Sequence, residues 1–185
     1  MFSFANIFGW LHTGCMLIGP LFKKKWQMLV NSMFSVSFAI TNYFLLGKAL
    51  SGAIVNFIAL IQLCCSLWHV RKEVKVPLWE RLIFLVAFVG AGMMGVQDFK
   101  DLLPVVGAVF FMVAAFQRDE QKTRILYLFN TSTWFTYDVI VGSAGMYGQF
   151  AAFCMYAYAL FRYRKKDTAK EANQQKQKQH KNKQQ

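Results

Sequence analysis

The sequence alternates long apolar segments with short polar gaps over its first 163 residues. A helix needs about 20 predominantly apolar residues to cross the hydrocarbon core of a bilayer, so each long segment predicts a membrane-spanning helix. Seven segments meet or approach that length: Phe4 to Phe22, Trp26 to Leu46, Ala49 to Val70, Leu82 to Gln97, Leu102 to Phe116, Ile125 to Val141 and Ala144 to Phe161. The pattern therefore predicts an all-α, polytopic membrane protein with seven transmembrane helices.

The composition fits residence in a membrane better than in water. Of the 185 residues, 56% are hydrophobic and 17% are aromatic, although the formal net charge is +12. Proteins that bind nucleic acid gather Lys and Arg on a face that contacts phosphates. Here the long segments between the basic clusters carry almost no charge. The composition therefore argues against nucleic acid as a partner and for the lipid bilayer.

Positive charges cluster in every second gap between the apolar segments. The clusters are Lys23 to Lys25, Arg71 to Arg81 and Arg118 to Arg124, and a further run begins at Arg162. Loops rich in Lys and Arg tend to stay on the cytoplasmic side of a membrane. With seven crossings, this rule places the N-terminus outside the cytoplasm and the C-terminus inside it.

The last residues differ in composition from the rest of the chain. Residues 164–185 are rich in Lys and Gln and show no hydrophobic periodicity, so they cannot bury a core. The sequence therefore predicts a membrane domain over residues 1–163, followed by a disordered cytoplasmic tail. Lys side chains next to a span also attract anionic lipid headgroups, each by about 1 kcal/mol.

The order of segments and gaps suggests an internal duplication, a common construction in transporters. Residues 4–70 contain a span, a basic gap, a span, a short outer gap and a span, and residues 102–163 repeat this order. The segment over residues 82–97 then links two three-helix repeats in a 3+1+3 arrangement. Because each repeat has an odd number of spans and a single span links them, both repeats share one orientation and are parallel.

Polar side chains inside the predicted spans indicate where function resides, because they are costly in hydrocarbon unless they face the bundle interior or a wet cavity. The main positions are His12, Asn31, Asn42, Asn56, Gln62, Asn130, Thr133, Tyr137, Asp138 and Gln149. In the second segment, a mixed polar and aromatic face at i, i+4, i+7 and i+11 comprises Asn31, Ser35, Phe38 and Asn42. A shift that places Gly47 on Gly142 moves this face onto Leu126, Asn130, Thr133 and Tyr137.

We expect the two equivalent helices to present these faces to a shared central pathway. Its candidate substrate-binding residues are Asn42, Asn56, Asn130, Trp134 and Tyr137. Trp134 stands out because it lies near the middle of a span, far from the interfaces where Trp usually gathers. Amides, hydroxyls and a flat ring suit a small polar neutral solute better than an ion. The same kinds of side chain also join helices through hydrogen bonds of about 0.6 kcal/mol, so a structural role stays open.

The sequence lacks the common catalytic and metal-binding patterns. It contains no paired carboxylates, no His-Glu-x-x-His and no intramembrane set of Ser, His and Asp, so we predict no enzymatic activity. The four Cys residues lie inside spans without the spacing of a zinc site, and we expect no metal and no cofactor. Asp138 is a carboxylate inside a predicted span, one turn from its outer end, and is a candidate for proton coupling.

Several pieces of the sequence resemble the YgjV-type bacterial inner-membrane protein family, over most of residues 4–164. The pieces are the run Lys23 to Leu46, Phe44 to Gly47 followed by Gly52 and Asn56, Leu103 to Gly107, and the region of Trp134 and Gly142. The resemblance implies the inner membrane of a bacterial cell as the location. Together with the charge pattern, it implies a periplasmic N-terminus and a cytoplasmic C-terminus.

The 3+1+3 layout is similar, more distantly, to the SWEET, PQ-loop and PnuC transporters, which implies facilitated passage of a small polar solute. In that pattern a Pro-Gln pair ends the first helix of each triplet and acts as a hinge. Here Pro20 precedes Leu21 and Ala115 takes the second position, so Pro20 is the candidate hinge. The pattern also places an Asn in the third helix of each triplet, which Asn56 matches and Ala151 does not.

We therefore predict a facilitator or transporter of a small polar solute, with a central pathway between two three-helix bundles. The alternative is a non-transporting seven-helix membrane protein, such as a receptor, a sensor or an assembly factor, that uses the same polar interior for packing or sensing. A homo-oligomer stays open in either case, because the sequence does not fix the number of copies.

Overall fold

The computed structural model describes residues 4–46, 50–94, 96, 98–141 and 146–163. Apart from turns and two short 3-10 helices, these residues form seven α-helices and no strand. The helices are α1 (Phe4–Ile18), α2 (Lys25–Leu46), α3 (Leu50–Lys72), α4 (Leu78–Met93), α5 (Leu102–Phe116), α6 (Glu120–Val141) and one over residues 146–163, here called the C-terminal helix. The prediction of an all-α, seven-helix chain is confirmed.

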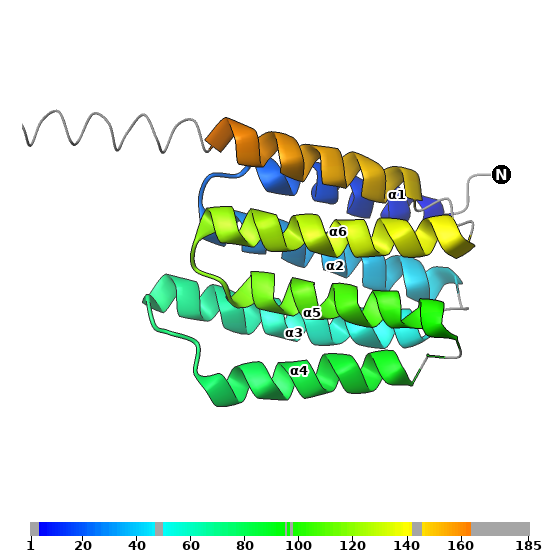
Figure 1. Cartoon of the computed structure of the whole chain (residues 1–185), viewed down its shortest axis with the longest axis horizontal. Helices are drawn as coiled ribbons and strands as arrows, with labels where there is room; N and C mark the ends of the chain where they lie inside the picture. Colours follow the sequence, from blue (N-terminus) through cyan, green and yellow to red (C-terminus); the bar gives the residue numbers. More distant parts are fainter. Residues whose placement is uncertain (1–3, 47–49, 95, 97, 142–145, 164–185) are drawn as a thin grey trace, which may run out of the picture.

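The helices form two layers with α4 at one edge (Figure 1). One layer holds α1, α2 and α3 in chain order, and the other holds α5, α6 and the C-terminal helix. α4 contacts both α3 and α5, which also contact each other, so it covers one side of the bundle. Corresponding helices of the two layers run in the same direction (Figure 1). Descent of the two layers from one ancestral unit stays a prediction.

Two helices begin earlier than their apolar segments predicted. α4 was predicted over residues 82–97, but both of its bounds lie four residues earlier, directly after Pro77 at its N-cap position. α6 was predicted from Ile125 but begins five residues earlier, where Asp119 Oδ1 accepts a hydrogen bond from the Lys122 backbone N–H at 2.8 Å. Helix caps and charged first turns lie outside the hydrophobic run that marks a span, so hydropathy alone misses them.

The first helix ends earlier than predicted, at a glycine and a proline. α1 stops at Ile18, and Gly19–Leu21 form a 3-10 turn. Gly19 lies so close to α2 that a Cβ there would stand 2.8 Å from Asn31 Nδ2. Pro20, the predicted hinge, is buried in this turn at the end of a helix, not in the middle of one.

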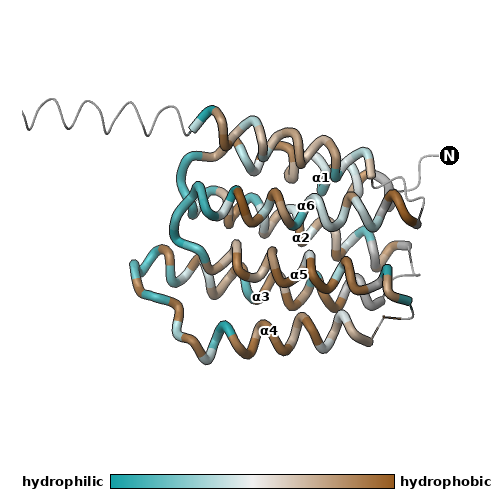
Figure 2. Tube along the Cα trace, viewed as in Figure 1, coloured by the Kyte–Doolittle hydropathy of each residue, from teal (hydrophilic) through white to brown (hydrophobic). Residues whose placement is uncertain are grey.

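Large apolar side chains cover the outside of the bundle, while several polar side chains are buried inside it. Trp10 on α1, Val86 on α4 and Phe161 on the C-terminal helix are each 70% exposed, whereas Gln62 and Thr131 are almost fully buried. The helices are apolar along most of their length (Figure 2). In a bilayer, lipid tails cover such an apolar exterior, and the polar groups find their partners inside.

Polarity is highest in the two central helices. Judged by length and hydropathy alone, Ile54–Lys72 within α3 is the single stretch of the described helices that qualifies as a membrane span. The stretches Ile7–Leu21 and Leu102–Phe116 are apolar but shorter. α2 and α6 carry more polar side chains, and they pack against each other across the two layers through residues such as Met28 and Tyr127.

The three basic clusters gather at one end of the bundle. Lys23 to Lys25 follow α1, Arg71 to Arg81 surround the α3–α4 connection, and Arg118 to Arg124 surround the α5–α6 connection, at the hydrophilic end in Figure 2. The C-terminal helix ends at the same side of the bundle (Figure 1). A membrane protein needs its basic connections at one end for the charge rule to apply. That this end faces the cytoplasm stays a prediction.

Lys25, the first residue of α2, ties the two layers together inside this basic end. It is 4% exposed, and its Nζ donates hydrogen bonds to Ala114 O at 2.7 Å and to Thr123 Oγ1 at 3.1 Å. Ala114 belongs to the last turn of α5, and its carbonyl oxygen also accepts a hydrogen bond from the Gln117 backbone N–H at 3.2 Å. Burial lowers the pKa of Lys25 to about 7, and both its charged and its neutral form can donate these two hydrogen bonds.

Arg124, near the start of α6, connects its layer to the end of α1 in the other layer. It is 2% exposed, and its Nε and Nη2 donate to Pro20 O at 3.3 Å and to Phe22 O at 2.7 Å, just beyond the end of α1. The guanidinium carbon also lies 4.3 Å from the ring centroid of Tyr163, whose hydroxyl donates to Leu21 O. Each layer thus extends one buried basic side chain, Lys25 or Arg124, to the end of the first helix of the other layer.

Replacing Arg124 with Ala is expected to destabilise the packing of the two layers. The change removes two charge-assisted hydrogen bonds and a cation–π contact, so we expect the free energy of unfolding to fall by about 2 to 4 kcal/mol. Lys122 is exposed nearby on the same helix, and Lys122→Ala should change this free energy by less than about 0.5 kcal/mol. Unfolding of the purified protein in mixed micelles measures both variants. An equal loss in the two would contradict the interlayer role.

Candidate functional site

A cavity of about 420 Å³ lies between the two layers. All seven helices contribute to its lining, and α2 and α6 contribute the most residues. Cavities of this volume bind small organic molecules in other proteins. The cavity occupies the position where the sequence predicted a central pathway.

The cavity has a polar side and an apolar side. Amides and hydroxyls come mainly from α2, α6 and the C-terminal helix, for example from Asn31, Thr131 and Gln149. α4 and α5 contribute apolar groups such as Phe88 and Val105. None of the lining residues in the described part of the chain is Asp, Glu, Lys or Arg. Within the same part of the chain, no three His, Cys, Asp or Glu side chains gather closely enough to hold a metal ion.

Most of the predicted substrate-binding residues line this cavity. They are Asn56 on α3 and Asn130, Trp134 and Tyr137 on α6. Asn42 lies outside the lining, further along α2, where its amide is within 4 Å of the position that a Cβ would take on Gly9 of α1. Pro20 also lies outside the lining. The side chain of Asp138, the candidate for proton coupling, falls outside the described residues.

Trp134 takes its position from a glycine on the neighbouring helix. A Cβ on Gly107 of α5 would stand 2.9 Å from Trp134 Nε1 and 3.5 Å from Asn130 Oδ1, so the indole needs glycine here. Tyr137 follows one turn later on α6, with its ring centroid 6.2 Å from that of Trp134 and the ring planes at 88°. This edge-to-face arrangement is one that aromatic pairs prefer. Together these contacts hold the indole at the cavity wall.

Two buried amide oxygens at the cavity have no partner. Asn130 Oδ1 and Gln149 Oε1 accept no hydrogen bond from the described residues. A buried acceptor left unpaired costs about 1 to 3 kcal/mol. Both side chains line the cavity, so a donor group on a bound solute or water can satisfy them. The cavity therefore favours ligands that carry hydroxyl or N–H groups.

The polar face of α2 is shared between the cavity and α1. His12 Nδ1 lies 2.9 Å from both the backbone O and the Oγ of Ser35, and Asn31 Nδ2 donates to Cys15 O at 2.7 Å. The ring of Phe38, one turn after Ser35, also packs on α1. Much of this face thus joins two helices, which is the structural role that the sequence left open. His12, Asn31 and Ser35 also reach the cavity.

Several lining residues were not among the predicted binding residues. His12 and Gln149 were recognised as polar residues within spans, but a single sequence does not say which helix they face. Tyr127 and Tyr156 were missed because Tyr also serves as a packing or interfacial residue. Tyr127 lies three residues before Asn130 on the same face of α6, and that spacing is the signal that identifies it. Its ring centroid is 5.4 Å from that of Tyr156, which joins α6 to the C-terminal helix.

One protein family matches almost the whole chain. A search of curated proteins and a search of solved structures find no match. The family model Imp-YgjV, described as bacterial inner membrane protein, matches residues 3–167. This range includes all seven helices and the cavity, and the match confirms the resemblance found in the sequence. The chain therefore belongs to the Imp-YgjV family of bacterial inner membrane proteins.

Proposed function

We propose that the protein carries a small, uncharged, polar solute across the inner membrane through the cavity between its layers. The main support is the chemistry of the lining. It consists of amides, hydroxyls, aromatic rings and aliphatic groups, with no Lys, Arg, Asp or Glu among the described lining residues. Polar side chains at the level of a membrane generally mark a solute or ion pathway, because they are costly there without a wet interior.

Among the described lining residues, a charged solute finds no Asp, Glu, Lys or Arg as a counter-ion. Moving an ion from water into a buried site without an opposite charge costs several kcal/mol. An uncharged solute with hydroxyl or N–H donors loses much less, because Asn130 and Gln149 offer unpaired acceptors. The apolar wall that includes Phe88 and Val105 suits the less polar face of such a solute. The lining thus favours neutral, partly apolar molecules over ions.

Passage requires that the cavity opens to each side of the membrane in turn. At the basic end, Lys25 and Arg124 help to hold the layers together through hydrogen bonds to backbone carbonyls and one hydroxyl. Hydrogen bonds of this kind exchange for bonds to water at a membrane interface at modest net cost. We therefore place the gate at the basic end at Lys25 and Arg124.

Trp134→Ala and Asn56→Ala are expected to abolish solute flux without lowering the amount of protein in the membrane, because both side chains line the cavity. Flux into vesicles that contain the purified protein is measured with a panel of sugars, vitamins and nucleosides. Trp10→Ala is the matched control and should keep full flux, since Trp10 lies on the outer surface. No flux for any solute would contradict transport and favour a receptor, sensor or assembly factor. Equal loss of abundance would make both residues structural.

Gly107→Ala is expected to displace Trp134 from the cavity wall. The added Cβ meets the indole at 2.9 Å, so we expect reduced flux and a free energy of unfolding lower by about 1 to 3 kcal/mol. Gly90→Ala on α4 is the control, because a Cβ there meets no atom within 4 Å. It should retain flux and gain up to about 1 kcal/mol of stability from better helix propensity. Identical flux in the two variants would show that Trp134 needs no such support.

Reporter fusions after Lys48 and after Arg164 are expected to report opposite sides of the membrane. The first should lie in the periplasm and the second in the cytoplasm, because basic connections stay inside and five spans separate the two positions. A reporter active in the periplasm and one active in the cytoplasm are fused at each position. If both positions give the same side, the seven-span topology is wrong.

A further inference from the structure

A second polar cluster lies outside the cavity, on a buried face of α3. Gln62, Ser66 and His69 follow Ala59 at intervals of three, four and three residues, which places all four on one helical face. Ala59 lines the cavity, and His69 lies in the last turn of α3 at the basic end. The three polar side chains are at most 7% exposed. This face therefore connects the cavity with the basic end by a row of buried polar groups.

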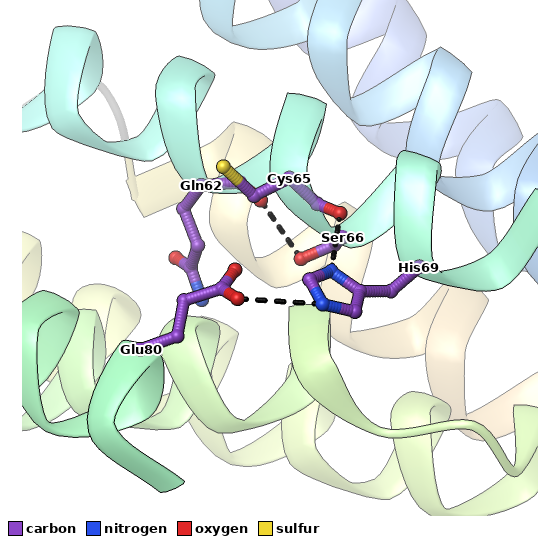
Figure 3. Close-up of polar contacts among 5 residues, drawn as sticks. All are labelled: Gln62, Cys65, Ser66, His69 and Glu80. Atoms are coloured by element: carbon purple, nitrogen blue, oxygen red, sulfur yellow. Dashed lines mark hydrogen bonds and ion pairs between the residues drawn. The ribbon is translucent and has the colours of Figure 1, made fainter. Parts of the chain in front are cut away.

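The contacts of His69 determine where a proton must lie (Figure 3). His69 Nδ1 lies 2.8 Å from Cys65 O, and a carbonyl oxygen only accepts, so Nδ1 carries a hydrogen. His69 Nε2 lies 3.3 Å from Glu80 Oε2 on α4. A bare Nε2 would point its lone pair at a carboxylate oxygen, and the two atoms would repel. One of the two groups must therefore be protonated, as imidazolium or as carboxylic acid.

Two buried acceptor atoms beside this pair have no partner. Gln62 Nε2 donates to Met112 O on α5 at 2.8 Å, which fixes the orientation of the amide because a carbonyl cannot donate. Gln62 Oε1 and Glu80 Oε1 both lack a hydrogen-bond partner among the described residues. Gln62 and Glu80 come from the neighbouring helices α3 and α4 (Figure 3). Both atoms can accept from water or hydronium, on the side of the pair that leads toward the cavity.

The pair can be reached from the membrane surface. An open groove on the outside of α3 and α4 is lined by Trp68, Trp79, His69 and Glu80, among other residues. Both Trp side chains are more than half exposed, and Trp gathers where the bilayer meets water. Protons from the water at the basic end therefore have a short route to the pair.

Few other titratable groups lie on the helices around this pair. α5, which supplies the bond to Gln62, has no titratable side chain. The other titratable residues of α3 and α4 are Cys64, Cys65, Arg71, Lys72 and Arg81. The three basic residues among them are exposed to solvent. Glu80 therefore has His69 as its ion-pair partner within the described chain.

We propose that His69 and Glu80 form the proton-binding site that couples solute passage to proton movement across the membrane, an inference that rests on the proposed transport function. The pair takes up one proton from water at the basic end and holds it between Nε2 and Oε2. It releases that proton past Gln62 to water in the cavity, and no other bond forms or breaks. Because the pair shares a single proton, the proposal takes one proton per transport cycle.

Solute accumulation tests this coupling in vesicles of the purified full-length protein. With a solute that the flux panel identifies, a gradient of one pH unit should shift the ratio of inside to outside concentration by up to about tenfold, because one proton contributes a factor of ten per pH unit. Glu80→Gln and His69→Gln should return the ratio to one. Glu73 is an exposed carboxyl on the connection between α3 and α4, so Glu73→Gln is the matched control and should keep the full shift of the concentration ratio.

Infrared difference spectra between two pH values test proton binding without any solute. Wild type and Glu73→Gln should show a pH-dependent band of the Glu80 carboxyl or the His69 imidazole, and both Glu80→Gln and His69→Gln should lose it. A spectrum unchanged by these two substitutions would overturn the proton-binding site. Because this measurement needs no transport, it also separates loss of the site from loss of solute flux.

The outcomes separate the coupling from the transport function itself. If solute flux in the wild type does not depend on the pH gradient, the coupling is overturned and the transport function stands. The coupling site is also wrong if the pH gradient still shifts the solute ratio in Glu80→Gln but no longer does so in Asp138→Asn. That result would assign coupling to Asp138, the residue that the sequence suggested. No flux for any solute overturns transport and coupling together, and the infrared result then decides separately whether the pair binds a proton.

Discussion

Two buried basic side chains determine how the layers of this protein meet. Lys25 and Arg124 each lie near the start of the second helix of one layer and donate to backbone carbonyls at the end of the first helix of the other. A helix end in apolar surroundings has carbonyls without partners, and each costs about 1 to 3 kcal/mol if it stays unpaired. The Arg124 contacts pair two carbonyls just beyond the end of α1, and the Lys25 contact adds a second hydrogen bond to Ala114 O in the last turn of α5. Both sets of contacts join the start of one layer's second helix to the other layer. The cavity depends on this union, because α2 and α6 supply most of its polar lining.

Close helix approach also depends on small residues. Gly107 lets Trp134 lie against α5, and Gly19 lets Asn31 lie against the end of α1. Because lipid covers the outside, helix association gains little from hydrophobic burial and depends on van der Waals contacts and hydrogen bonds. The interior polar side chains thus divide into two groups. Those that bond a neighbouring backbone, such as Asn31, hold helices together, and those with an unpaired atom, such as Asn130, are available to a solute.

The sequence predicted the helices because length and hydropathy are local properties. Errors occurred at helix ends, where caps such as Pro77 and Asp119 lie outside the apolar run. Contacts across the bundle are not local. The spacing correctly placed Asn42 on one helical face with Asn31, but the far end of that face lies against α1 and not in the cavity. Likewise, Lys25 was interpreted as a charge that marks the cytoplasmic side, whereas its burial depends on partners 89 and 98 residues away.

The placement of charge explains how the cavity stays neutral. Every buried charge among the described residues has its partner outside the cavity: carbonyl groups for Lys25 and Arg124, and His69 for Glu80. All of these residues lie toward the basic end, where water is near and desolvation of a charge costs less than at the bilayer centre. Under the proposed function, assembly and proton binding thus use charge, while a solute in the centre meets the dipoles of the described lining residues. Dipoles bind a neutral molecule weakly, and passage requires weak binding, because a solute held too tightly does not leave on the far side.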